Sequence, residues 1–213
     1  MFGIGKKTTE ATASDLGVAQ GRISLQKNQI ISLTKTPKIT VTVTWPDRTD
    51  YDVFALVLYT DGHVETVAQF GTERNPRDYR PSTTDGAVTH LGDIKRGTGR
   101  DIANESIDIA LNPNIAAIVP VVYSAKSNGT GSFRRYQVGM SIDNGQGDIV
   151  TIDAHDASDN DHIYSCVPGI IRNTSAVQIQ KLELYSKPNS ELRPTIDRHG
   201  NVHMDTGPEN ARK

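Results

Sequence analysis

The sequence predicts an all-β fold: a sandwich of two antiparallel sheets with long acidic and glycine-rich loops between its strands. Three observations support this prediction. Short segments of alternating or continuous apolar residues recur along the chain, and they end at turns rich in Gly, Asn, Asp and Pro. Val, Ile and Thr, which favour extended backbone, are concentrated in these segments. No long segment repeats its apolar residues with the helical period of about 3.6.

The first strands are expected in the segment that begins at Arg22. The polar turn at residues 27–29 is flanked by the apolar residues Ile23, Leu25, Ile30, Ile31 and Leu33, so we expect two short strands joined as a hairpin. In residues 39–45 the apolar side chains alternate with threonines, which is the pattern of a strand with one buried face.

The segment Val53 to Tyr59, VFALVLY, is continuously apolar and has the length of a strand. Such a run predicts a central strand that is buried on both faces. The Asp-Gly pair that follows, Asp61 and Gly62, is typical of a tight hairpin turn. Residues 63–68 are therefore expected to return as the hairpin partner of this strand.

The later strands are separated by polar loops at residues 72–85 and 92–104. Pro120 lies inside the apolar segment 115–123, and a proline within a strand predicts either an edge position or a bulge. The remaining strands are expected over residues 87–91, 105–111, 115–123, 133–142, 149–152, 162–167 and 176–185.

The composition fits one soluble domain. The chain has 213 residues, of which 36% are hydrophobic and 23% charged, and its net charge is -2. Because nucleic acids attract a basic surplus that this chain lacks, no nucleic-acid partner is expected. Cys166 is the single cysteine, which excludes an intrachain disulfide and a cysteine-rich zinc site, and we expect it to be a buried structural thiol.

The domain is predicted to occupy residues 22–187, between two less regular ends. Residues 1–21 are rich in Thr, Ala, Gly and Ser and predict a flexible N-terminal arm; residues 188–213 predict a polar C-terminal tail. The arm lacks the apolar stretch of a secretory signal, and no apolar run approaches the roughly 20 residues that span a bilayer. We therefore expect a cytoplasmic protein without a transmembrane segment.

Two acidic loops could hold a cation. Asp50 and Asp52 stand two residues apart on an extended segment and should point to the same side, where their charges repel unless a cation lies between them. Asp93, Asp101 and Glu105 belong to a glycine-rich loop that offers carboxylates and carbonyls, the ligands of calcium. Equally, acidic residues are common in turns, and nearby basic residues could neutralise them. Both interpretations stay open at this point.

The densest acidic stretch is residues 153–162. It does not match the EF-hand loop, which needs Gly at position six and Glu at position twelve, so we favour a solvated loop over a metal site. His155 and His162 flank it, which suggests a transition-metal site or a hydrolase as alternatives. The sequence of this stretch does not indicate a nucleophile paired with a base. The chain also lacks the sequence motifs of a nucleophile elbow, a P-loop and a dinucleotide-binding site. We expect a protein without enzymatic activity.

Several segments, taken in order, resemble the TerD family of tellurium-resistance proteins over residues 22–187. The resemblance is carried by a Trp that ends a strand, an acidic Asp-aromatic-Asp motif, an Asp-Gly turn, the segment DGAVTHLGD and a glycine run that ends in an acidic residue. In this chain these features are Trp45, Asp50–Ala55, Asp61 and Gly62, residues 85–93, Gly97, Gly99 and Glu105.

The resemblance implies a calcium-binding β-sandwich with a role in tellurite resistance and stress response. It places the calcium ligands in the two acidic segments. Carried over to this sequence, the implied metal site consists of Asp50, Asp52, Asp93, Gly97 and Glu105, with Asp101 as a substitute for a missing aspartate.

Departures from the family pattern weaken the implied site. Phe54 replaces an aspartate, Ile94 replaces an asparagine, and Ala103 and Asn104 stand where two aspartates are expected. Calcium affinity falls as carboxylates are lost, so the sequence predicts a divergent member whose Ca²⁺ site is weak or lost.

Two functions follow from these expectations. The first is a calcium-binding, non-catalytic stress-response module that binds protein partners, including a membrane-associated stress complex. The alternative is a metal-free structural or assembly protein that uses its terminal arms for docking.

Overall fold

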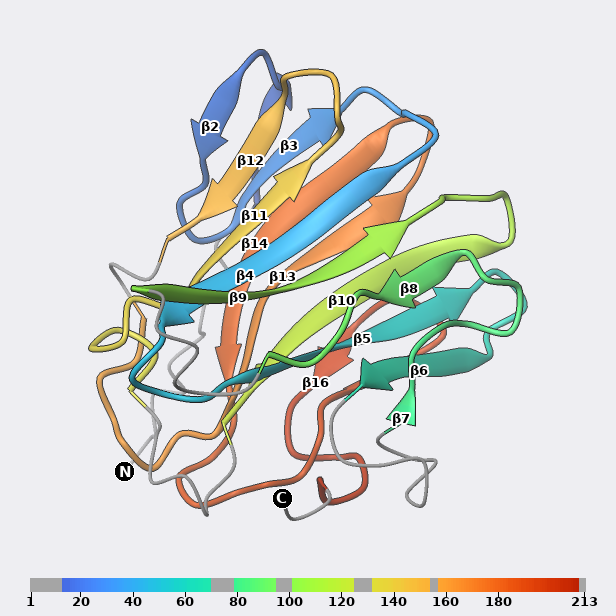
Figure 1. Ribbon diagram of the computed structural model, residues 1–213. Coiled ribbons are helices and arrows are strands. Elements are labelled where there is room, and N and C mark those ends of the chain that lie inside the picture. Colours follow the sequence, from blue (N-terminus) through green and yellow to red (C-terminus); the bar gives the residue numbers. More distant parts are fainter. Residues whose placement is uncertain (1–12, 70–78, 95–100, 125–131, 154–156, 211–213) are drawn as a thin grey trace, which may run out of the picture.

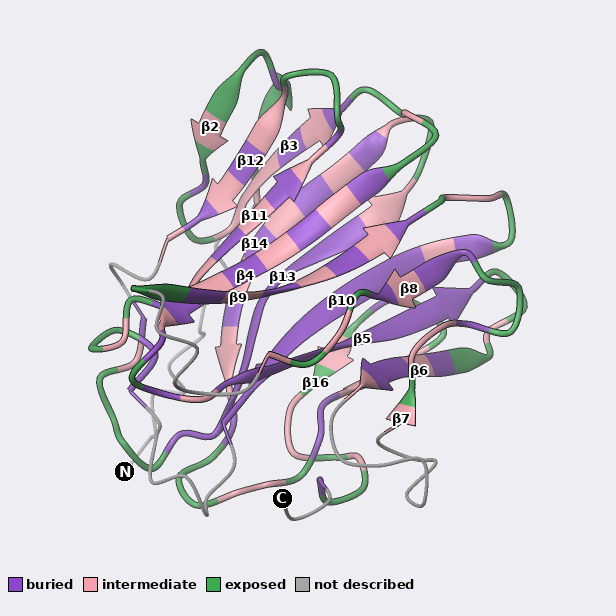
Figure 2. Ribbon diagram, viewed as in Figure 1, coloured by how far each residue is buried: buried purple, intermediate pink, exposed green. Residues whose placement is uncertain are grey.

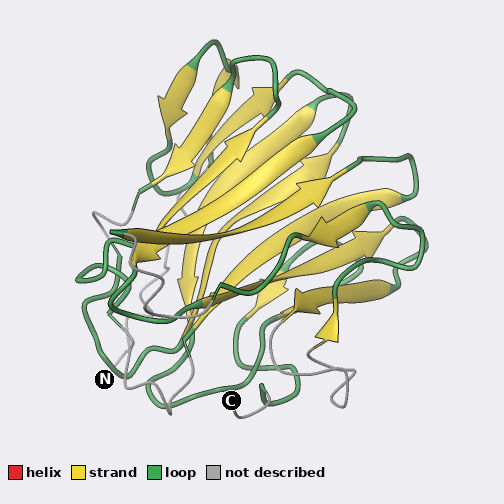
Figure 3. Ribbon diagram, viewed as in Figure 1, coloured by secondary structure: helices red, strands yellow, loops and turns green. Residues whose placement is uncertain are grey.

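The computed structural model describes residues 13–69, 79–94, 101–124, 132–153 and 157–210 (Figure 1). These residues form strands, turns and loops (Figure 3). No helix in the described part of the chain is long and apolar enough to cross a membrane.

The described strands form two main sheets, as the sequence predicted, and one small sheet that the sequence did not predict. The eight-stranded sheet contains, from edge to edge, β1 (Ser14–Val18), β3 (Gln29–Leu33), β14 (Val177–Tyr185), β13 (Ser165–Asn173), β10 (Ile115–Tyr123), β5 (Asp52–Tyr59), β6 (Val64–Gln69) and β7 (Tyr79–Arg80). The six-stranded sheet contains β2 (Arg22–Ser24), β12 (Ile149–Ile152), β11 (Gly139–Asp143), β4 (Ile39–Pro46), β9 (Ile102–Ile109) and β8 (Val88–His90). The small sheet pairs β15 (Thr195–Ile196) with β16 (Val202–His203).

Most neighbouring strands are antiparallel, as expected, but each main sheet has one parallel pair at an edge. β1 runs parallel to β3, and β2 runs parallel to β12. Part of the segment that we expected to be a flexible N-terminal arm thus belongs to a sheet. Amide-to-carbonyl hydrogen bonds from Ser14 to Asn28 and from Ala19 to Ser32 fix this part beside β3.

The space between the main sheets is filled by alternate side chains of the strands. In β4, the side chains of Ile39, Val41, Val43 and Trp45 are buried while the intervening threonines are half-buried, which confirms the predicted period of two. These residues belong to a large apolar cluster to which both sheets contribute, called here the inter-sheet core. The residues that alternate in the sequence therefore mark the inner face of the six-stranded sheet.

β5 is buried on both faces, as its continuous apolar run predicted (Figure 2). Val53, Ala55 and Val57 face the inter-sheet core, while Phe54 and Leu56 belong to a second apolar cluster. This outer cluster also includes residues of β10 and β13 and, from the chain end, Ile196, Val202 and Met204. Residues 187–210, called here the C-terminal layer, thus cover the outer face of the eight-stranded sheet.

The C-terminal layer is fixed by buried polar contacts as well as by apolar packing. The Arg193 guanidinium lies 5.1 Å from the centre of the Phe54 ring, and Arg193 Nε donates a hydrogen bond to Asn210 Oδ1 at 2.5 Å. The Tyr123 hydroxyl donates to Glu191 at 2.9 Å. A segment that we expected to be a polar tail therefore packs on the sandwich up to residue 210.

The predicted hairpin over residues 23–33 is wrong. β2 pairs with β12, whereas β3 pairs with β14 and β1, so the two strands lie in different main sheets. The buried side chain of Leu25 lies in the inter-sheet core at the point where the chain crosses from one sheet to the other. Apolar patterning locates a strand but does not select its partner.

Of the two alternatives for Pro120, the edge position is wrong and the bulge is confirmed. β10 lies between β5 and β13, and its register with β13 shifts between Ile118 and Val122. A bulge tolerates a residue that has no N–H to donate. A smaller difference concerns residues 133–137, which were predicted as strand and form turns instead, with β11 beginning at Gly139.

We predict that Phe54→Ala destabilises the protein by about 3–5 kcal/mol, because it opens a cavity under Arg193 in the outer cluster. Urea unfolding followed by tryptophan fluorescence measures the loss. Leu192→Ala, at a side chain in the same layer that is 39% exposed, is the control and should change stability by less than about 0.5 kcal/mol. Equal effects of the two substitutions would contradict a structural role for the outer cluster.

Candidate metal centre

Three carboxylates converge at one end of the sandwich. Asp52 is the first residue of β5, Asp93 follows β8, and Glu105 lies on β9. One carboxylate oxygen from each of these residues lies within 4.8 Å of those from the other two. Asp52 and Glu105 are almost fully buried, at 1% and 2% exposure, while Asp93 is exposed. This group, called here the acidic site, brings together residues of both acidic loops that the sequence singled out.

The two sheets are joined directly at this point. Glu105 lies on the inner face of the six-stranded sheet, since its neighbours at alternate positions, Ala103 and Ile107, belong to the inter-sheet core. Its Oε2 accepts a hydrogen bond of 2.8 Å from the backbone N–H of Val53, in the eight-stranded sheet. The acidic site therefore bridges the sandwich rather than lying on one sheet alone.

The Glu105 carboxylate is further held by the loop that follows β8. Its Oε1 accepts a hydrogen bond of 3.2 Å from the Ile94 N–H, and its Oε2 lies 3.4 Å from Nε2 of His90. Burial raises the pKa of Glu105, while hydrogen bonds from His90 and from the amides of Val53 and Ile94 oppose that rise. A cation beside this carboxylate would favour its ionised form further.

The donors of the acidic site fit a hard cation. All three side chains offer carboxylate oxygens, which calcium and magnesium prefer, and none of the three offers a thiolate or an imidazole. Asp52, Asp93 and Glu105 would hold the ion, whose charge would offset their mutual repulsion.

The other predicted ligands do not join this group. Asp50 is half-buried and Asp101 is exposed, and neither belongs to the three converging carboxylates. Asp101 instead contributes its backbone carbonyl, which accepts a hydrogen bond of 3.3 Å from the Asp47 N–H and so ties the two loops together. Gly97 lies outside the described residues.

The residues that depart from the family pattern have structural roles. The Phe54 side chain is in the outer cluster, and Ala103 is in the inter-sheet core. Ile94 packs against the inter-sheet core and donates its amide to Glu105. Sequence reasoning missed the backbone amides of Val53 and Ile94, because any residue except proline supplies an N–H and no side-chain pattern marks its role.

The Asp-Gly pair at the start of DGAVTHLGD has a structural role too. Asp85 accepts hydrogen bonds from the Tyr59 hydroxyl (3.0 Å), the Thr83 hydroxyl (2.7 Å), the Ala87 amide (3.0 Å) and the Asn112 side chain (2.9 Å). Partial burial alone would raise the pKa of Asp85, but these hydrogen bonds outweigh it and lower the pKa to about 2. Asp85 therefore joins β5 to the turn before β8.

The third acidic loop is held by its own neighbours. Asp159 accepts a hydrogen bond of 2.7 Å from the Ser132 hydroxyl, and Asp161 forms an ion pair of 3.0 Å with Arg135. Asp153 accepts a hydrogen bond of 2.6 Å from Ser24. The sequence favoured a solvated loop here, and these contacts add that three of its carboxylates bind neighbouring side chains. His155 lies outside the described residues.

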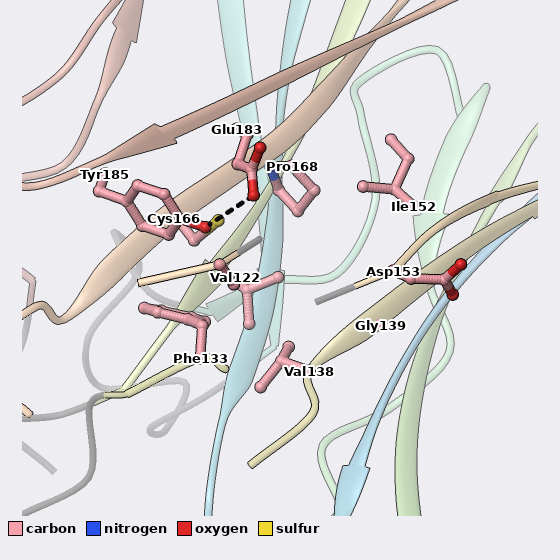
Figure 4. Close-up of a pocket in the computed structure, with 11 residues that line it drawn as sticks. Val122, Phe133, Val138, Gly139, Ile152, Asp153, Cys166, Pro168, Glu183 and Tyr185 are labelled. Atoms are coloured by element: carbon pink, nitrogen blue, oxygen red, sulfur yellow. Dashed lines mark hydrogen bonds between the residues drawn. The ribbon is translucent and has the colours of Figure 1, made fainter. Parts of the chain in front are cut away.

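A small cavity lies beside Cys166 (Figure 4). Its volume is about 20 Å³, roughly the space for one water molecule. The Tyr185 hydroxyl donates a hydrogen bond of 3.4 Å to Glu183, which also lines the cavity. Burial raises the pKa of the Cys166 thiol, so this side chain is an unreactive structural thiol, and its predicted burial is confirmed.

Comparison with known proteins gives one family. Residues 22–152, more than half of the chain, match the family described as the TerD domain. A solved structure of a homologue of the telluride resistance protein TerD from Streptomyces coelicolor A3(2) is 17% identical, covering 70% of this chain and 89% of its own, with a TM-score of 0.49. A solved structure of a protein of unknown function is 15% identical, covering 81% and 92%, with a TM-score of 0.46. No curated protein sequence matches the chain significantly.

We predict that Asp85→Asn lowers the free energy of unfolding at pH 7 by on the order of 1 kcal/mol, because its new NH₂ group would face the NH₂ group of Asn112. The effect is this small because Asp85 is exposed and water screens its charge. The pKa of Asp85 is lower in the folded protein than its usual 3.8, so its charge stabilises the fold above about pH 4. That contribution is lost as pH falls toward about 2.

Thermal melts of the wild type and Asp85→Asn between pH 7 and pH 2.5 measure this effect. The difference between the two melting temperatures should narrow as the pH falls. A constant difference would mean that the Asp85 charge contributes nothing.

Proposed function

This chain belongs to the TerD domain family, and we propose that it is a non-catalytic interaction module that depends on a calcium ion bound by Asp52, Asp93 and Glu105. The convergence of the three carboxylates carries the proposal. The family and the oxygen-only donor set both favour a hard cation over a catalytic centre. The proposed role is in tellurite-type stress resistance in the cytoplasm.

Electrostatic repulsion supports a bound cation. At a separation of 4.8 Å, two carboxylates repel by roughly 3 kcal/mol at an effective dielectric constant of about 20. Two of the three are nearly buried, so water screens them poorly. A divalent ion between the three carboxylates would attract each of them and outweigh their mutual repulsion.

Such an ion would also link the loop that carries Asp93 to both sheets. Asp52 begins a strand of one sheet, Glu105 lies on the other, and Asp93 is on an exposed loop. An ion shared by these residues would tie the loop to both sheets and reduce its motion. By ordering this loop, the cation would regulate the binding of a protein partner without any catalytic step.

Apolar side chains near the acidic site support a protein partner. Leu91 is 57% exposed and Ile102 is 58% exposed, and both lie within a few residues of a proposed ligand. Contiguous exposed apolar surface marks protein interaction sites. We propose that a protein partner, within a membrane-associated stress complex, contacts this end of the sandwich when calcium is bound.

The metal-free alternative relied on terminal arms that are available for docking. In the described residues, β1 is paired within the eight-stranded sheet and the C-terminal layer is packed over its outer face. Within the described residues, these contacts occupy Ser14–Val18 of the arm and the C-terminal layer. The observation favours the cation-dependent module over the scaffold with docking arms.

We predict that calcium raises the melting temperature. An ion at about 100 times its dissociation constant would stabilise the native state by about 2.7 kcal/mol, which for a chain of this size is a rise of about 5–10 °C. Differential scanning calorimetry in excess EGTA and in millimolar calcium measures the rise. Identical melts would remove the calcium proposal and favour the metal-free scaffold.

We further predict that Asp93→Asn weakens calcium binding by tenfold or more, about 1.4 kcal/mol, while leaving the metal-free protein at least as stable as the wild type, because the substitution relieves the repulsion between Asp93 and the two buried carboxylates. Asp93 is exposed, so its substitution removes a charge without disturbing the core. Asp101→Asn is the matched control, because Asp101 is also exposed, lies in the second acidic loop and is outside the acidic site. Isothermal titration should show a selective loss in Asp93→Asn; equal losses would contradict the assignment.

A further inference from the structure

His90 lies beside one carboxylate of the acidic site, with its Nε2 3.4 Å from Oε2 of Glu105. It is the last residue of β8 and is 3% exposed. Its Nδ1 lies 3.1 Å from the backbone nitrogen of Gly92, and its Nε2 lies 3.0 Å from the carbonyl oxygen of Val53. The ring therefore spans from the loop that carries Asp93 to the strand that begins with Asp52.

These two contacts fix the tautomer of the ring. A backbone N–H can only donate, so Nδ1 must accept from Gly92 and carries no proton. A carbonyl oxygen can only accept, so Nε2 must carry the proton and donate it to Val53. The hydrogen-bond pattern assigns a neutral imidazole with its proton on Nε2.

His90 and Glu105 form hydrogen bonds with the same two backbone segments. At Val53, His90 binds the carbonyl oxygen and Glu105 binds the N–H. In the loop after β8, His90 binds the Gly92 N–H and Glu105 binds the Ile94 N–H. Two side chains thus satisfy four backbone groups, and Nε2 of one lies 3.4 Å from Oε2 of the other.

The four backbone groups flank the two aspartates of the acidic site. Asp52 directly precedes Val53, and Asp93 lies between Gly92 and Ile94. Fixing the N–H groups of Gly92 and Ile94, one residue before and one residue after Asp93, restricts where its carboxylate can lie. Gly92 has a φ of 128°, which a residue with a side chain rarely adopts, so the loop reaches this position through its glycine.

We propose that His90 is a positioning residue that, together with Glu105, holds Asp52 and Asp93 in place before a cation arrives. The inference rests on the proposed function, since it assigns a role toward the proposed calcium ion. The three carboxylates would supply the negative charge that binds the ion, while the hydrogen bonds of His90 and Glu105 fix the backbone beside Asp52 and Asp93. Groups that orient ligands in this way strengthen binding, because less ordering remains to be done when the ion binds.

Two substitutions separate the two contacts of His90. In His90→Asn, the side-chain oxygen can take the place of Nδ1 and accept from Gly92, but nothing reaches the Val53 carbonyl. In His90→Gln, the longer side chain can place its NH₂ near the Val53 carbonyl, but the acceptor for Gly92 is lost. His199→Gln, at an exposed histidine in the C-terminal layer, is the control.

NMR of the metal-free protein tests the geometry. In the wild type, the ¹⁵N shifts of the His90 ring should show a protonated Nε2 and an unprotonated Nδ1. The Gly92 amide should exchange slowly in the wild type and in His90→Asn, and quickly in His90→Gln. The carbonyl ¹³C shift of Val53 should be kept in His90→Gln and changed in His90→Asn. A wild-type ring protonated on Nδ1 overturns the proposal, even if both variants fail to fold.

Calcium titration tests the positioning role of His90. Each His90 variant should bind calcium roughly 10- to 100-fold more weakly than the wild type, and His199→Gln should bind it equally well. Folded His90 variants with wild-type affinity would overturn the positioning role while leaving the proposed function intact. A wild-type protein that binds no calcium would overturn both. The two failures are therefore distinguishable.

Discussion

The burial of β5 on both faces is the constraint that organises the molecule. A strand without a polar face must be covered twice, and here the six-stranded sheet covers one face while the C-terminal layer covers the other. Because β5 is held so firmly, Asp52 and Val53 at its start offer a rigid base for a binding site.

The acidic site is built where this rigid strand meets a loop. Asp52 is fixed by its place on β5, Glu105 by its place on β9, and Asp93 by the backbone on either side of it. Buried carboxylates are costly to a fold unless they are hydrogen-bonded or paired with a cation. Retaining two of them at the junction of the sheets is consistent with a functional requirement rather than a need for stability.

Local pattern predicted the strands well, and predicted the site only in part. The alternating burial of β4 and the continuous burial of β5 follow from residues adjacent in the sequence, so both could be predicted from it. The separation of β2 from β3 depends on partners far along the chain, which pattern alone does not select. Asp50 was grouped with Asp52 by spacing, but the strand begins at Asp52, so strand alternation does not extend to Asp50. The C-terminal layer was missed because scattered residues such as Ile196 give no periodic signal.

The order of strands in the larger sheet limits how this protein can be divided. The TerD domain match ends at residue 152, yet β13 and β14 lie between β10 and β3 in the middle of the eight-stranded sheet. A fragment cut at that boundary would lose the strands that join the two halves of this sheet. The segment after residue 152 is therefore as much a part of the folding unit as the matched domain, although the family match does not reach it.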